Sequence, residues 1–322
     1  MINWLYSCLK IRSGLNIEST TDNVNAKFYR LLTFAIFILG IVGLGSIGLN
    51  LITKYQQVQQ LEQMHWANEM LSEGKYQQAI AAYEELEATD LVKAPILWTN
   101  RGYAYLGLDR YTSALESCSQ ATTLNPRAAL AWNCKGEAQF YLGNNNAALT
   151  AMNRAIALEP NNATFKLNQS QVLQELGQHR QAIELNQKAI ALLKSQQSSK
   201  NTLAMAFKGQ GQSWLELDQN QKALSAFDKS LIYKPKDVAA QQGLAIALYR
   251  LGEYSQAIKT IEKILDRQDL TIEQQAINWL YKAISLCETP QISKSKAAFN
   301  RVIKFSNNPE LLKIAKSGCG IR

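Results

Sequence analysis

Hydrophobic and polar positions follow a helical rhythm through most of the chain, and this rhythm recurs at a fixed spacing. Within residues 94–160, two consecutive stretches align residue by residue with a shift of 34 positions. The shift pairs Trp98 with Trp132, Gly102 with Gly136, Ala114 with Ala148, Ala121 with Ala155, and Pro126 with Pro160. A fixed period of this length is typical of proteins built from stacked repeats. The pattern therefore predicts an all-α chain of helix pairs.

The period predicts about seven helix–turn–helix repeats over residues 60–309, starting near residues 60, 95, 129, 163, 204, 238 and 276. A column of small residues on the second helices marks the register: Ala79, Ala114, Ala148, Ala182, Ala223 and Ala257. The long step between Ala182 and Ala223 indicates an insertion at 194–201. Residues 310–322 are expected to form a capping helix.

Small residues allow two helices to approach closely, so we expect the glycines of the first helices to face this alanine column. Four other glycines follow the first helices, where a left-handed residue is needed: Gly74, Gly143, Gly177 and Gly252. Proline stops a helix, and Pro126, Pro160 and Pro235 follow the second helices. The tryptophans are expected in the core.

These residues resemble the tetratricopeptide repeat family. One copy carries nearly the whole family pattern: Trp98, Gly102, Tyr105, Tyr111, Ala114, Ala121 and Pro126, with Cys118 in place of the usual aromatic residue. The resemblance implies a right-handed superhelix of helix pairs. It is specific for the fold and says little about the function.

An apolar segment precedes the repeats. Residues 31–52 contain 22 residues without a charge, enough to cross a hydrocarbon core of ~30 Å as a helix. The sequence thus predicts an N-terminal tail at 1–30, a transmembrane helix at 31–52 and a connecting helix at 53–59. A cleaved signal peptide is the alternative, but no suitable cleavage site follows the apolar core. Because more Lys and Arg lie before the segment than after it, the N-terminus is expected in the cytoplasm, with the repeats on the opposite side of the membrane.

The net charge of +8 is unevenly distributed. Residues 291–322 carry seven Lys and Arg against Glu310, whereas residues 60–290 are close to neutral. The repeats therefore lack the basic stripe that nucleic-acid binding requires, and no nucleic-acid partner is expected. Two interpretations of the basic C-terminal stretch remain open: contact with an acidic partner or anionic lipid, or the solvated face of a terminal cap.

The chain shows no chemistry typical of an enzyme. Its five cysteines include no CxxC motif and its two histidines lie far apart, so no metal site and no cofactor are expected. Phosphate-binding and nucleophile motifs are also missing, which predicts a non-enzymatic protein. Cys118 and Cys134 fall on successive packed helices; whether they form a disulfide is left open, and Cys287 is expected to be a buried helix residue.

The family resemblance implies that the first helices line a concave groove that holds a peptide or partner helix. The groove positions give the candidate peptide-binding residues Asn68, Asn100, Tyr103, Asn133, Glu137, Asn168, Gln171 and Lys208. Asn100, Asn133 and Asn168 form a ladder one repeat apart, and Asn amides can bond both backbone groups of an extended peptide. The alternative is that these are simply solvated Asn side chains.

The sequence thus predicts a membrane-tethered adaptor or scaffold that docks a protein partner in its groove and helps to assemble a membrane complex. Two alternatives are kept: a self-associating structural protein of a membrane assembly, which would form a homo-oligomer, and a nucleic-acid-binding helical repeat.

Overall fold

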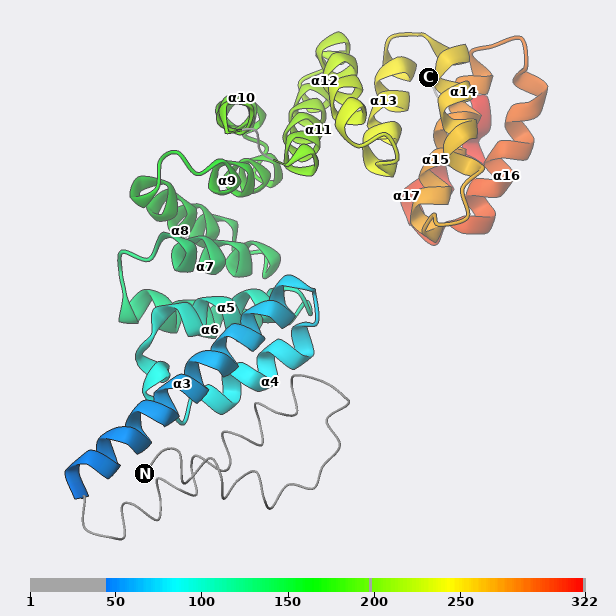
Figure 1. Ribbon diagram of the computed structural model, residues 1–322. Helices are drawn as coiled ribbons and strands as arrows, with labels where there is room; N and C mark the ends of the chain where they lie inside the picture. Colours follow the sequence, from blue (N-terminus) through cyan, green and yellow to red (C-terminus); the bar gives the residue numbers. More distant parts are fainter. Residues whose placement is uncertain (1–44, 197–198, 321–322) are drawn as a thin grey trace, which may run out of the picture.

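The structure is a computed structural model that describes residues 45–196 and 199–320. The described residues form fifteen α-helices and no strand. Seven first helices alternate with seven second helices along the chain, and α17 follows the last pair (Figure 1). The prediction of an all-helical solenoid is confirmed.

The first helices of the pairs are α3 (Gly45–Ser72), α5 (Pro95–Leu106), α7 (Ala129–Tyr141), α9 (Ala163–Glu175), α11 (Lys200–Glu216), α13 (Val238–Arg250) and α15 (Ile272–Cys287). The second helices are α4 (Tyr76–Leu86), α6 (Tyr111–Leu124), α8 (Asn145–Leu158), α10 (His179–Ser195), α12 (Asn220–Tyr233), α14 (Tyr254–Leu265) and α16 (Ser295–Phe305). The C-terminal cap is α17 (Pro309–Ser317), and three short turns of 3-10 helix complete the fold: η1 (Asp90–Lys93), η2 (Ile292–Lys294) and η3 (Gly318–Gly320).

The predicted membrane-spanning segment needs correction. Residues 31–44 lie outside the described part of the chain, and residues 45–52 begin α3. From Lys54 onward α3 is rich in Gln and Glu, so its apolar stretch is short. Among the helices that the structure describes, none is both long and apolar enough to cross a membrane. This finding contradicts the prediction of a single-pass membrane protein, and with it the predicted orientation in the membrane.

The alanine column lies at the centre of each helix pair. Its six members have no exposed surface, as the repeat pattern predicts: Ala79, Ala114, Ala148, Ala182, Ala223 and Ala257. Small side chains at these positions let the two helices of a pair pack closely, and larger apolar side chains fill the space on either side. Each repeat is therefore held mainly by burial of apolar surface.

The glycines of the first helices make room for a side chain of the second helix, a detail that the pattern did not specify. A Cβ atom on Gly136 would lie 2.6 Å from Cγ of Met152 and 3.2 Å from the carbonyl oxygen of Ala148. Likewise, a Cβ on Gly211 would lie 2.8 Å from Cε1 of Phe227. The glycines thus pack against residues four positions beyond the alanine column as well as against the column itself.

The tryptophans are less buried than predicted. Trp98 and Trp132 are half-buried, and each indole N–H donates to a carbonyl oxygen just before its helix, that of Val92 (2.6 Å) and that of Pro126 (3.0 Å). Trp66 on α3 is 45% exposed. These hydrogen bonds explain why Trp98 and Trp132 lie at the edge of the core, because an indole N–H that leaves water needs an acceptor.

The helix pairs stack into an arc with the first helices on its inner side. Each first helix contacts the first helix of the next pair, whereas no comparable contact joins successive second helices in the described chain. The stack is therefore more closely spaced along the first helices, which makes that face concave. Figure 1 shows this arrangement at α9 and α11, with α10 and α12 on the outer side of the arc.

Four cysteines form two disulfides. Cys118 on α6 is bonded to Cys134 on α7, with their Cα atoms 5.8 Å apart, which answers the question that the sequence left open. Cys287 at the end of α15 is bonded to Cys319 in η3, with a Cα–Cα distance of 5.5 Å. Cys287 is thus half-buried and bonded, where an unpaired core residue was predicted; its partner lies 32 positions away and approaches only because α17 turns back along α15.

Candidate functional site

All eight candidate residues lie on first helices, which form the concave face. Asn68 is on α3, Asn100 and Tyr103 are on α5, Asn133 and Glu137 are on α7, Asn168 and Gln171 are on α9, and Lys208 is on α11. The spacing of one repeat between neighbours places them on the first helices of five successive pairs. Side-chain hydrogen bonds join six of the eight into two clusters.

The first cluster joins α3, α4 and α5. The Asn100 amide Nδ2 donates to Oδ1 of Asn68 over 2.8 Å, and the hydroxyl of Tyr83 donates to the same oxygen over 2.7 Å. Burial raises the pKa of Tyr83 to about 12, so its hydroxyl remains a donor at neutral pH. Both lone pairs of the Asn68 carbonyl oxygen are therefore occupied within the chain.

The second cluster joins α5, α7 and α9. Asn168 Nδ2 donates to Glu137 Oε1 over 2.8 Å and to Asn133 Oδ1 over 3.1 Å. Asn133 Nδ2 donates to the hydroxyl oxygen of Tyr103 over 3.0 Å and also to Glu137. Asn133 is only 1% exposed, so this cluster ties together the first helices of three successive pairs from the inside.

Glu137 is the electrostatic centre of the second cluster. Burial raises its pKa to about 7, while the hydrogen bond from Asn133 acts in the opposite direction. Burial also raises the pKa of Tyr103, and the nearby Glu137 charge adds to the effect. Near neutral pH the Glu137 carboxyl group therefore changes its protonation state in a buried polar setting, with Tyr103 and Tyr141 as the nearby titratable groups.

The structure keeps the two remaining candidates apart from these clusters. Gln171 is exposed on α9. Lys208 Nζ lies 3.3 Å from Oδ2 of Asp237, the residue that caps the N-terminus of α13. The lysine thus joins α11 to the following repeat and does not contact the asparagine ladder.

Sequence reasoning missed the contacts that connect the ladder to its surroundings. Tyr83 belongs to a second helix, where a groove residue was not expected. Gln174 on α9 donates from Nε2 to the carbonyl oxygen of Gly209 (2.7 Å) and to Oγ of Ser213 (2.8 Å) on α11. The amide ladder thus continues from α9 to α11 through a glutamine in place of an asparagine. A search for any side-chain amide on the first helices would have found it.

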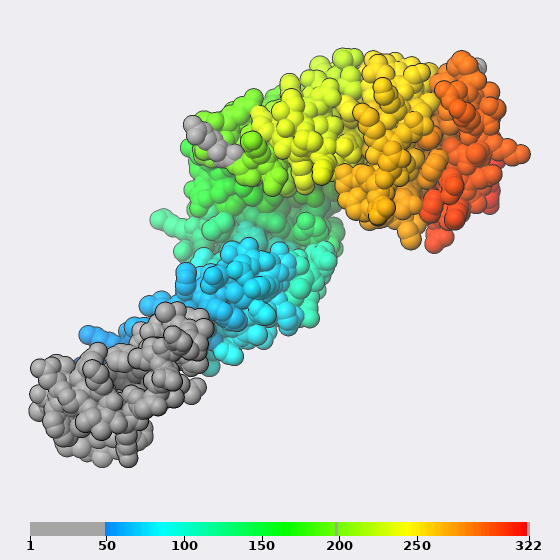
Figure 2. All heavy atoms as spheres, turned by 45° about the vertical axis from the view of Figure 1, so that its right-hand side comes forward, coloured from blue at the N-terminus to red at the C-terminus, as the bar shows by residue number. Residues whose placement is uncertain are grey.

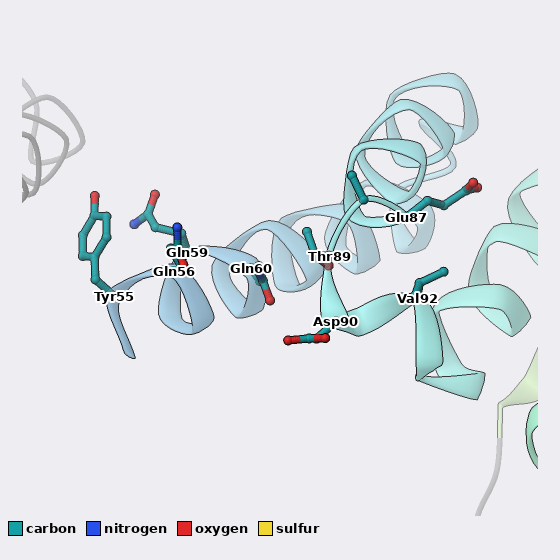
Figure 3. Close-up of a pocket in the computed structure, with 9 residues that line it drawn as sticks. Tyr55, Gln56, Gln59, Gln60, Glu87, Thr89, Asp90 and Val92 are labelled. Carbon is teal, nitrogen blue, oxygen red and sulfur yellow. The ribbon is translucent and has the colours of Figure 1, made fainter. Parts of the chain in front are cut away.

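A pocket of about 680 Å³ lies away from the concave-face candidates (Figure 3). Figure 3 shows that its lining comes from α3 and from the connection after α4: Tyr55, Gln56, Gln59, Gln60, Glu87, Thr89, Asp90 and Val92. Arg101 forms an ion pair with Glu87, whose side chain points away from the glutamines in this view. In the described chain, no group of three His, Cys, Asp or Glu is placed to hold a metal ion.

The fold and this face define a class of protein, the helical-repeat solenoids. Three family models, each described as tetratricopeptide repeat, match residues 66–132, 129–162 and 215–277. Together with the helix pairs and the buried alanine column, these matches show that the chain belongs to the tetratricopeptide repeat family. A sequence comparison with curated proteins finds no match.

Solved structures show the same fold at low identity. The chain is 17% identical to a chain of the APC/C hetero-tetramer Cut9–Hcn1 (TM-score 0.63), covering 78% of this chain and 47% of that one, so it spans about half of that protein. A tetratricopeptide repeat protein from Parabacteroides merdae is 17% identical with a TM-score of 0.57, covering 80% of this chain and 98% of that one. PilW, described as a widely conserved type IV pilus biogenesis factor, is 21% identical with a TM-score of 0.59, covering 68% and 97%.

Proposed function

We propose that this protein is a non-enzymatic adaptor that binds an extended peptide segment of a partner protein along the concave face of its first helices. Tetratricopeptide repeat proteins generally bind protein partners, and the fold is consistent with an interaction scaffold. The observation that carries the proposal is the row of side-chain amides and hydroxyls along the concave face from α3 to α9.

The row has two parts with different roles. Asn133 and Asn168 use their amide donors within the chain, so they hold α5, α7 and α9 at a fixed spacing. Gln171, which is exposed, offers its whole amide group to a ligand, and the half-buried Asn100, whose Nδ2 already donates one hydrogen bond to Asn68, offers the rest of its amide. A side-chain amide has a donor and an acceptor, the pair of groups that an extended peptide backbone presents.

A matched pair of glutamines tests this face. Gln171 is exposed on α9, and Gln187 is exposed on α10, on the outer side of the same repeat. Peptides are first selected from a phage-displayed random library on the full chain, and the affinity of the best one is then measured for Gln171→Trp and Gln187→Trp. We expect Gln171→Trp to weaken binding by about tenfold or more, which corresponds to about 1.4 kcal/mol.

Gln187→Trp should bind as the wild type does. Equal affinities of both variants would place the peptide elsewhere and refute the proposed groove. Circular dichroism of both variants establishes that each retains its helices, so that a loss of binding is not a loss of folding.

A further inference from the structure

The two ends of the solenoid carry opposite charge. Residues 45–94, which contain α3 and α4, hold seven Asp and Glu against three Lys, a net charge of −4. Residues 291–320, which contain α16 and α17, hold six Lys and Arg against Glu310, a net charge of +5. The basic C-terminal end of the sequence therefore has an acidic counterpart at the other end of the same repeat stack.

The acidic end presents an uncovered helix face. Along α3, residues spaced by three or four positions form an exposed stripe, which we call the α3 stripe: Val58, Leu61, Glu62, His65, Trp66 and Glu69. Its apolar members are strongly exposed, at 44% for Val58, 60% for Leu61 and 45% for Trp66. This face lies where a preceding repeat would stack, and terminal repeats of solenoids ordinarily present a polar face there.

The basic end carries exposed residues on its last two helices, which we call the cap face: Lys296, Asn300, Ile303 and Lys304 on α16 with Lys313 and Lys316 on α17. All six are exposed, and Ile303 at 40% lies one helical repeat of seven residues from Lys296. None of its lysines forms an ion pair with another described residue, nor do Glu62 and Glu69 of the α3 stripe. Both surfaces thus combine apolar side chains with charges of one sign that are not neutralised within the described chain.

The two surfaces cannot meet within one molecule. In both views α3 lies at one end of the arc and α16 and α17 lie at the other (Figures 1 and 2). A contact between them therefore joins two copies. Because the two surfaces differ, the contact is heterologous, and its repetition produces open chains unless a rotation closes them into a ring.

We propose that copies of this protein associate head to tail, with the α3 stripe of one copy docked on the cap face of the next. Glu62 and Glu69 face lysines of the cap, and Leu61 and Trp66 bury apolar surface against Ile303. The charges guide the encounter and fix the partner surface, and the apolar side chains supply the burial at its centre.

The test is sedimentation velocity of the full chain over a range of concentrations, at low salt and at high salt. We expect oligomers that grow with concentration and that dissociate as salt rises, since the Debye length falls from ~10 Å at 0.1 M to ~3 Å at 1 M. The double variants Glu62→Lys/Glu69→Lys and Lys296→Glu/Lys304→Glu should each weaken self-association by about tenfold or more.

Mixing these two charge-reversed variants should restore association, because each then offers the end that the other lacks. The controls reverse equally exposed charges in the middle of the solenoid, Glu175→Lys/Glu184→Lys and Lys188→Glu/Lys229→Glu, and these should associate as the wild type does. A monomer at every concentration and salt level would overturn the proposal, including the case in which residues 1–44 of the same chain occupy the α3 stripe. Self-association that is unchanged in the charge-reversed variants would also overturn the proposal. So would a mixture of the two variants that fails to associate.

Discussion

At the scale of single residues, one backbone position decides the turn between the two helices of a repeat. In six successive repeats the residue there has a positive φ angle, which L side chains adopt at a cost. Four of them are glycines, with φ of 75° at Gly74, 79° at Gly143, 71° at Gly177 and 78° at Gly252. The other two are Asp109 (57°) and Asp218 (53°), which the glycine pattern alone did not reveal.

Gly143 offers a clean measurement of that cost. Apart from its two chain neighbours, no described residue has an atom within 4 Å of a Cβ built on Gly143, so Gly143→Ala adds backbone strain without a clash. We expect a loss of about 1 kcal/mol in the free energy of unfolding, measured by urea denaturation. Gly143→Asp should cost less, because Asp already occupies this position in two turns; an Ala variant as stable as the wild type would contradict the argument.

Glu137 gives the protein a pH-dependent stability. Its pKa is raised to about 7 in the folded state, above the value of a carboxyl group in the unfolded chain, so the folded state binds the proton more tightly. The stabilisation is present at low pH and is lost as pH rises through about 7. We expect Glu137→Gln, which keeps an uncharged polar group, to be more stable than the wild type at pH ~8 by up to about 3 kcal/mol and nearly equal to it at pH ~4, below the pKa of the unfolded carboxyl group.

The measurement is urea denaturation of both proteins at the two pH values. If the difference in unfolding free energy between the wild type and Glu137→Gln is the same at both pH values, the carboxyl group is solvated in the folded state and the argument is wrong. Asn133→Ala, which removes a donor to the same carboxyl, should raise its pKa further and extend the loss of stability to higher pH.

At the scale of elements, the close approach of paired helices depends on the alanine column. Ala148 on α8 has no exposed surface, whereas Ala147 beside it is exposed. Ala148→Phe should overpack the contact with α7 at a cost of about 1–3 kcal/mol and lower the melting temperature. Ala147→Phe is the matched control and should leave it nearly unchanged; equal melting curves for the two variants would refute the register.

The second disulfide fastens the last element to the stack. α17 packs on α15 and α16 through Leu311, Ile314 and Ala315, and Cys287–Cys319 closes the same contact. We expect Cys287→Ser/Cys319→Ser to speed hydrogen exchange in α17 while the helices before α15 keep their protection. In the denatured, unreduced protein a thiol reagent should titrate one of the five cysteines, since four are bonded; five free thiols would contradict both disulfides.

At the scale of the whole molecule, stability is expected to be local. Among the described helices, each pair packs on the next pair and on no more distant one, so the stack behaves as a row of neighbours. Ala148→Phe should therefore raise hydrogen exchange in α5 to α10 and leave α13 to α16 as in the wild type. A uniform increase along the whole chain would indicate a single cooperative unit.

The sequence by itself determined the repeats, because a helix pair can pack only if small and large residues recur at fixed places. The alanine column and the prolines after the second helices were all visible from this recurrence. The same reasoning proposed a membrane-spanning helix from an apolar run, and the part of that run that the structure describes continues instead into the polar helix α3.

The tertiary structure decided what depends on residues from different repeats. The hydrogen bonds from Asn133 and Asn168 to Glu137 and the pairing of Cys287 with Cys319 arise from stacking, which brings together residues that lie far apart in the chain. A repeat pattern specifies the contacts within one unit and with its neighbour. The pattern does not specify which polar side chains lie on the concave face of the whole stack. Nor does it specify which surfaces remain uncovered at the two ends of the stack.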